Sequence, residues 1–190
     1  MKLDRHGKAE PLKFNEYRKI RNGFRLESHK LILDIGYSTG ERWGAILRLR
    51  VEDVYVDPIA RTIHPDITFR KHTRKDKATR QCPISQSLKL RLNSYAPPVS
   101  GFLFPSPLMP ASHLSDRAAD AALRRALERA GLGELGYSTH STRRGLINRL
   151  HDAGTSLKVI QSITGHKSLV VLAGYIDVSD SQRRHAIEVA

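Results

Sequence analysis

The chain has 190 residues, of which 39% are hydrophobic, and this fits one ordinary domain with a sizeable core. Its single cysteine, Cys82, excludes an internal disulfide framework and a cysteine-based zinc site, and no apolar run suits a signal peptide or a membrane span. These features predict a soluble, cytoplasmic protein. Thirty-two Lys and Arg residues against nineteen Asp and Glu give a net charge of +13, so we expect the partner to be a polyanion, either a nucleic acid or an anionic membrane.

The first part of the chain predicts an arm and then two helices. Residues 1–19 are polar and basic, and we expect them to form a loose arm that leads into the first helix. From about Ser28 an apolar run predicts a buried helix that ends at the turn Ser38-Thr39-Gly40. A second helix should start there, because Trp43, Ile46 and Leu47 recur at helical spacing and would face inward.

A group of short strands is predicted next. They cover residues 54–56, 61–69 and 80–84, where the helical pattern gives way to short runs of β-formers. The connection over residues 71–78 is dense in Lys and Arg, which is typical of a solvated hairpin tip. We predict that the three strands form one small antiparallel sheet.

Helical patterns dominate the rest of the chain. They run over residues 115–130, 140–153 and 156–164, and a glycine that can close a helix follows each of them. A last helix is predicted to begin at Ser179. The predicted fold class is therefore α+β, mainly α-helical with a three-stranded antiparallel sheet.

The side chains that could carry chemistry fall into four basic clusters. Arg42 directly follows the Thr39-Gly40-Glu41 turn. In His140-Ser141-Thr142-Arg143 a spacing of three places the histidine and the arginine on one face of a helix. Thr164-Gly165-His166 is followed nine residues later by Tyr175. The remaining cluster is the hairpin tip, with Lys71, Arg74, Lys75 and Lys77.

This set of residue types suits phosphoryl transfer. Two guanidinium groups can clamp the non-bridging oxygens of a crowded phosphorus with several donors. Tyrosine can act as a covalent nucleophile, although a free phenol has a pKa of about 10 and needs a cationic field and a base to react near neutrality. A lysine or histidine can then protonate the departing oxygen. The sequence shows no carboxylate cluster for Mg²⁺, so cationic side chains would take the metal's role.

The spacing of these clusters resembles the tyrosine recombinases of the phage integrase family. Thr39-Gly40-Glu41-Arg42, His140-Ser141-Thr142-Arg143-Arg144 and Thr164-Gly165-His166 look like the family's TG-x-R, H-x-x-R-R and LGH boxes. Lys75, Arg80 and Pro83 match its K-x-G-x-x-x-R-x-x-P hairpin except that Lys77 replaces the glycine. With Tyr175 these make five boxes in the family's order, from about residue 28 to residue 179, which relatedness explains far better than chance.

The resemblance implies a role for each of the main residues. Arg42 and Arg143 would clamp the scissile phosphate. Tyr175 would attack it, forming a 3′-phosphotyrosyl link and releasing a 5′-hydroxyl, with Lys75 as the general acid for that leaving oxygen.

The two histidines and the rest of the machinery follow from the same resemblance. His140 would assist the tyrosine proton, and His166 would hydrogen-bond a non-bridging oxygen. No cofactor or metal is implied. The partner would be a double-stranded DNA recombination site, recombined through a Holliday junction by a homotetramer that is a monomer or weak oligomer when free of DNA, in a bacterial nucleoid or a phage-infected cell. Further DNA contacts are expected from Lys71, Arg74, Lys77, Arg80 and Arg144.

Three features depart from the family's usual pattern. Ala45 stands where an acidic residue usually buttresses the site, and Glu41 stands where an apolar residue is usual. Neighbouring helix positions face different directions, so Glu41 is not expected to replace the missing carboxylate. Residues 1–27 would be a basic arm and first helix and residues 28–190 the catalytic domain, without the separate N-terminal DNA-clamping domain usual in the family. The chain is thus either an excised fragment or a minimal recombinase.

Other interpretations of the same residues stay open. Arg42 and the hairpin cations could be solvated surface charges, and Arg144 could hold helices together. His166 could cap a helix, and Tyr175 could be a half-buried aromatic residue of the core. At the level of the whole protein, the alternatives are a DNA-binding protein that kept the fold and lost catalysis, and an RNA-binding module that only the charge supports.

Overall fold

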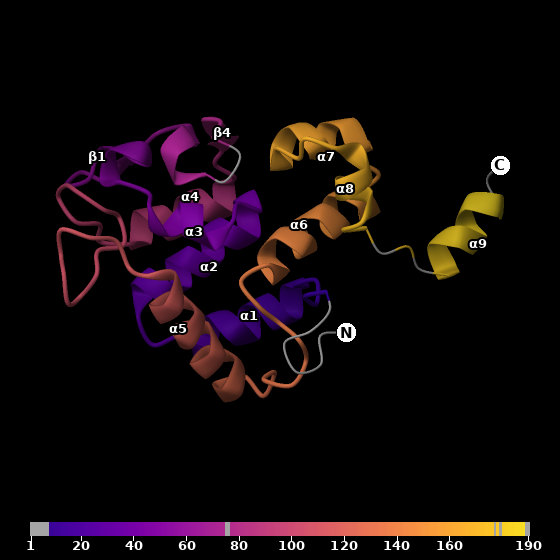
Figure 1. Cartoon of the computed structure of the whole chain (residues 1–190), viewed down its shortest axis with the longest axis horizontal. Helices are drawn as coiled ribbons and strands as arrows, with labels where there is room; N and C mark the ends of the chain where they lie inside the picture. The colour runs from indigo at the N-terminus through magenta and orange to yellow at the C-terminus, as the bar shows by residue number, and fades with distance from the viewer. Residues whose placement is uncertain (1–7, 75–76, 177, 179, 189–190) are drawn as a thin grey trace. The chain divides into compact units, whose positions relative to one another are not determined.

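The computed structural model describes residues 8–74, 77–176, 178 and 180–188 (Figure 1). These residues fall into two compact units, divided between Leu146 and Ile147, and each unit is described by itself. Within the described part of the chain, no helix combines the length and the hydropathy that a membrane crossing requires.

The first unit is a helical core with short strands at its edge. The helices α1 and α2 pack against each other, α1 also contacts α5, and α2 contacts α3 and α4 (Figure 1). The mainly helical α+β class predicted from the sequence is confirmed. The helices are α1 (Phe14–Gly23), α2 (Glu27–Thr39), α3 (Trp43–Leu47), α4 (Gln86–Ser94) and α5 (Asp116–Arg129), with single 3₁₀ turns η1 (Val51–Asp53) and η2 (Lys71–Thr73).

The expectation of a loose arm through residue 19 is wrong, because the helix α1 already begins at Phe14. Tyr17, Ile20 and Phe24 are buried, and their spacing of three and four places them on the side that faces the core. The Tyr17 hydroxyl also donates a hydrogen bond of 2.6 Å to the buried Asp34 carboxylate. The apolar stripe formed by these three residues is narrow and lies among polar residues, so the segment did not appear helical from its sequence.

The segment before α1 lies along the helix α6 (Ser141–Asp152), which contributes residues to both units. The backbone N–H of Leu12 donates to the Ser141 carbonyl at 3.1 Å, and the Arg144 guanidinium donates to the Ala9 carbonyl at 2.7 Å. Leu12 is almost fully buried. Gly145 lets the two backbones approach, because a Cβ atom on this residue would overlap the Leu12 carbonyl oxygen.

We therefore expect Gly145→Ala to lower the free energy of unfolding by about 1–3 kcal/mol, the usual range for overpacking a site that cannot give way. The change would be measured as the shift of the midpoint of urea unfolding at unchanged slope. Gly133→Ala is the matched control, because the nearest atom to its added Cβ would be Glu128 Cγ at 3.9 Å. Equal midpoints for the two variants would show that the N-terminal segment does not press on α6.

The strands form two separate two-stranded antiparallel ladders, so the prediction of one three-stranded sheet is wrong in this detail. β1 (Tyr55–Asp57) pairs with β2 (Thr62–Ile63), and β3 (Asp66–Phe69) pairs with β4 (Arg80–Pro83). The sequence suggested one continuous strand over residues 61–69, but Pro65 interrupts it. Proline has no N–H to donate to a ladder, and it therefore separates the partner of β1 from the partner of β4.

The second unit is small and helical. Its core is formed by Ile147, Ile160 and Leu172. Ser156 caps the start of α7 through its hydroxyl, and Gly165 ends that helix in the left-handed conformation at φ 69°, as the sequence predicted. The predicted start of the last helix at Ser179 lies outside the described residues. The helices are α7 (Leu157–Thr164), α8 (Leu169–Ala173), which the sequence did not predict, and α9 (Asp180–Glu188).

Candidate active site

In the first unit, the turn between α2 and α3 holds one candidate arginine and contacts another. Gly40 ends α2 in the left-handed conformation at φ 61°, and a Cβ on it would press into the Leu146 side chain. Arg143, on α6, donates from Nη1 to the Gly40 carbonyl at 2.9 Å, and only 2% of the residue is exposed. Arg42 lies two residues after Gly40, forms the N-cap of α3 and is half-buried. The fold thus brings a buried arginine to the turn that carries the half-buried one, 101 positions away in the sequence.

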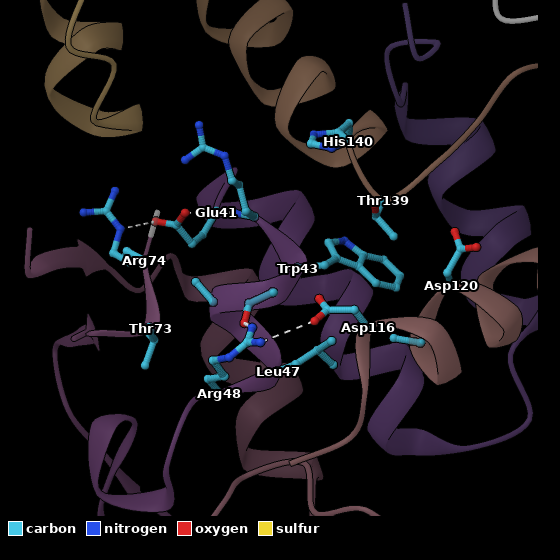
Figure 2. A pocket seen from close by; sticks show the side chains of 14 residues that line it. Glu41, Trp43, Leu47, Arg48, Thr73, Arg74, Asp116, Asp120, Thr139 and His140 are labelled. Carbon is cyan, nitrogen blue, oxygen red and sulfur yellow. Dashed lines mark hydrogen bonds and ion pairs between the residues drawn. The ribbon is translucent and has the colours of Figure 1, made fainter. Parts of the chain in front are cut away.

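A pocket of about 410 Å³ opens beside this turn (Figure 2). Its lining includes Arg42, Arg74 of the hairpin, and Thr139 and the exposed His140, which directly precede α6. Ala45 also lines the pocket. The lining therefore includes three of the cationic or titratable side chains that the sequence singled out, which suits an anionic ligand.

The hairpin between β3 and β4 differs from the solvated tip that the sequence suggested. Arg74 and Arg80 are buried, and their Nε atoms lie 3.1 Å and 3.6 Å from Oε2 of Glu41, which is 1% exposed. Lys71 and Lys77 are exposed. Lys75, the predicted general acid, lies outside the described residues.

In the second unit, His166 and Tyr175 form a separate pair. The His166 ring is 8% exposed, and its Nδ1 lies 2.7 Å from the Thr164 hydroxyl. The ring centroids of His166 and Tyr175 lie 5.1 Å apart. Tyr175 is half-buried after α8, and its carbonyl accepts a hydrogen bond of 3.0 Å from the Asn148 side chain. This unit therefore places the candidate nucleophile next to a fixed imidazole.

Two further side chains, one of them a predicted DNA contact, have structural surroundings. Arg144 is buried and holds the Ala9 carbonyl, so it joins α6 to the N-terminal segment. Cys82 is buried in β4, and burial raises the pKa of its thiol, which keeps the sulfur protonated and unreactive. Among the described residues there is no group of three or more His, Cys, Asp or Glu side chains that could hold a metal ion.

Sequence reasoning set aside one residue that the structure places among the candidates. Glu41 contacts two guanidinium groups, and its Oε1 accepts a hydrogen bond of 2.9 Å from the backbone N–H of Arg42. A signal was present, since an acid in a turn between two apolar helices of a strongly basic chain needs a cationic partner if it is buried. The sequence could not show which cations supply it.

Comparison with known proteins decides the family. A sequence model of the phage integrase family matches residues 11–182, which is most of the chain. The chain belongs to the phage integrase family. Among the curated members, the integrase of Escherichia phage P2 is 27% identical over 161 residues, which cover 85% of this chain and 41% of the P2 protein. The chain therefore spans less than half the length of that relative.

Solved structures of tyrosine recombinases share the fold. The XerA recombinase superposes with a TM-score of 0.74 at 19% identity, covering 95% of this chain and 65% of XerA. A lambda integrase dimer bound to a COC′ core site gives a TM-score of 0.68 at 19% identity, covering 94% of this chain and 49% of that protein. XerH bound to its palindromic difH substrate, in a post-cleavage complex, gives a TM-score of 0.69 at 19% identity, covering 97% of this chain and 54% of XerH. These likenesses show that the fold matches that of tyrosine recombinase catalytic domains.

Proposed function

We propose that this chain is the catalytic domain of a tyrosine recombinase that cleaves and rejoins double-stranded DNA through a 3′-phosphotyrosyl intermediate on Tyr175. The observation that carries the proposal is the position of Arg143. A guanidinium is buried at a substantial free-energy penalty, and here it lies against the turn that carries Arg42. A phosphate that binds two such groups gains charge-assisted, bidentate hydrogen bonds in a site of low dielectric constant.

In the proposed reaction the phosphate is clamped and then transferred. Arg42 and Arg143 bind the non-bridging oxygens and stabilise the charge that develops on them. The Tyr175 oxygen bonds to phosphorus while the bond from phosphorus to the 5′ oxygen breaks. The phenol proton passes toward His140, and Lys75 gives a proton to the departing oxygen. His166 donates to a non-bridging oxygen, which requires its Nε2 to carry the hydrogen. Attack by a 5′-hydroxyl of another strand reverses these steps and rejoins the DNA, and no metal takes part.

The proposed partner is a DNA recombination site, and the proposed assembly is a homotetramer on DNA that acts through a Holliday junction. The lambda integrase and XerH structures hold their own DNA sites, and the first is a dimer. Lys71 and Lys77, both exposed, are proposed to contact the DNA backbone. We place the reaction in the cytoplasm, in the nucleoid or in a phage-infected cell, and the chain as a monomer or weak oligomer before it binds.

A second candidate is a DNA-binding protein that has kept the fold and lost catalysis. It is favoured by Ala45, which lines the pocket beside Arg42 with a methyl group where the family usually has a carboxylate. Such a protein would still bind DNA through its net charge of +13.

Covalent capture on DNA separates the two candidates. The probe is a pool of duplexes with randomised sequence around a fixed nick, placed so that cleavage releases a short 5′-hydroxyl fragment and traps the protein. We expect a covalent adduct on a denaturing gel, enriched for one sequence after repeated selection and sequencing. Salt-sensitive retention of the pool without any adduct would favour the DNA-binding alternative and overturn the proposed enzyme.

A further inference from the structure

We propose that Glu41 is a positioning residue that ties both sides of the hairpin connection, at Arg74 and Arg80, to the turn that carries Arg42. The inference rests on the proposed function, since it assigns Lys75 the role of general acid. It adds a residue that the family pattern leaves apolar.

Glu41 contacts the chain on both sides of the hairpin connection. Its Oε2 lies 3.1 Å from Arg74 Nε (Figure 2) and 3.6 Å from Arg80 Nε, so one carboxylate joins the residue directly before Lys75 to the first residue of β4. All three residues are buried. Charges in such a cluster are only weakly screened by salt, and removing the Glu41 carboxylate takes one counter-charge from both arginines.

The two arginines of this cluster also form hydrogen bonds within the hairpin and with the α2–α3 turn. Arg74 Nη1 donates to the Ala78 carbonyl at 2.7 Å, across the connection that carries Lys75. Arg80 Nη2 donates to the Thr39 carbonyl at 3.1 Å, and its guanidinium lies 5.6 Å from the centre of the Phe69 ring. The two arginines therefore link the hairpin to the α2–α3 turn, and both form ion pairs with Glu41.

Glu41 also forms a hydrogen bond with the backbone of Arg42. Glu41 Oε1 accepts the backbone N–H of Arg42 at 2.9 Å, and the Glu41 N–H donates to the Thr39 hydroxyl at 3.1 Å. The two oxygens of one carboxylate thus hold the start of α3 and the hairpin. A general acid must lie within hydrogen-bond reach of the leaving oxygen. Because Lys75 follows Arg74 directly in the sequence, holding Arg74 at this turn limits how far Lys75 can lie from Arg42.

The test compares Glu41→Gln, which keeps the shape and removes the charge, with Asp34→Asn. Asp34 is a matched control because it is also a buried acid of this unit, 2% exposed, with Arg21 Nε at 2.9 Å, and it lies outside the hairpin cluster. Glu41→Asp, which keeps the charge on a shorter side chain, serves as the milder variant if Glu41→Gln folds poorly.

The first readout, amide hydrogen exchange over residues 70–80, does not depend on activity. We expect exchange there to be at least about tenfold faster in Glu41→Gln than in the wild type, and unchanged in Asp34→Asn, because only the first loses the contacts that hold this segment. Wild-type protection of residues 70–80 in Glu41→Gln would overturn the inference.

The second readout separates loss of the general acid from general damage. The probe is the duplex selected by the wild type, made with either the normal 5′ oxygen or a bridging 5′ sulfur at the scissile phosphate. Sulfur leaves without a proton because a thiol is far more acidic than an alcohol. We expect Glu41→Gln, like Lys75→Ala, to cleave the oxygen duplex about 100-fold more slowly than the wild type, and the sulfur duplex within a few fold of it.

The outcomes also distinguish the inference from the proposed function. Equal slowing on both duplexes would mean that Glu41 acts on the fold or on the phosphate clamp, and would overturn the positioning role. A wild type that forms no adduct would refute the proposed enzyme. In that case the exchange measurement alone would decide whether Glu41 holds the hairpin.

Discussion

Replacing Tyr175 with phenylalanine should abolish covalent capture of DNA completely while leaving DNA binding intact. The change removes only the hydroxyl, which is the proposed nucleophile, and no water or neighbouring side chain can form the protein–DNA bond in its place. The ring contact with His166 and the hydrogen bond from Asn148 to the Tyr175 carbonyl do not need the hydroxyl. We therefore expect the free energy of unfolding to change by no more than about 0.5 kcal/mol.

The measurement is the fraction of protein shifted on a denaturing gel, beside the binding constant from a filter or mobility assay at several salt concentrations. The wild type and the variant should show the same slope of binding against salt, because the same cations meet the phosphates. An adduct formed by Tyr175→Phe at the wild-type rate would mean that another side chain is the nucleophile.

Replacing Arg143 with alanine should slow cleavage by about a thousandfold or more, the scale seen when an arginine that stabilises a transferring phosphoryl group is lost. Arg143→Lys should restore little of this rate, because an ammonium group cannot supply the planar fork of donors. The position makes the effect large, since a residue only 2% exposed acts in a site of low dielectric constant. The rate would be measured in single turnover with the selected duplex in excess.

The loss of Arg143 also removes a structural hydrogen bond, and a control is needed for that effect. Arg129 makes the same kind of bond, from its guanidinium to the Gly23 carbonyl at 2.7 Å, away from the pocket. Arg129→Ala should therefore lower stability without changing the cleavage rate by more than a few fold. Similar slowing in both variants would assign the effect of Arg143 to folding instead of catalysis.

Much of the fold was predictable because local signals mark its boundaries. Gly40 and Gly165 stand after apolar helical runs, and both end their helices with positive φ as expected. The prediction of a three-stranded sheet was wrong because Pro65, which has no N–H to donate, interrupts the β-forming run over residues 61–69. The start of the first helix was placed too late because its buried face is only a narrow stripe in a polar segment.

The candidate site was predictable in its residue types but not in its internal partners. The order and spacing of the boxes indicated Arg42, Arg143 and Tyr175, because the pattern resembles that of the family. The sequence did not distinguish the buried Arg74 from the exposed Lys71, since both belong to one basic run. Only the fold shows that Glu41 reaches the hairpin, because side-chain pairing over 33 positions leaves no local pattern.

The departure at Ala45 is easier to understand beside Glu41. Both residues line the pocket next to Arg42, one with a methyl group and the other with a buried carboxylate. Neighbouring positions on a helix do face different directions, but Glu41 precedes α3 and lies in the turn, so that objection does not apply to it. A carboxylate is therefore present next to Arg42 even though the usual position lacks one.

The most direct measurement is mass spectrometry of the trapped adduct after digestion with trypsin and nuclease. Cleavage after Lys167 and Arg183 releases residues 168–183, in which Tyr175 is the single tyrosine. We predict that this peptide carries the nucleotide, that fragmentation places it on Tyr175 through a 3′-phosphoryl link, and that the released DNA fragment ends in a 5′-hydroxyl. A nucleotide attached to any other peptide, or joined through its 5′ phosphate, would contradict the account.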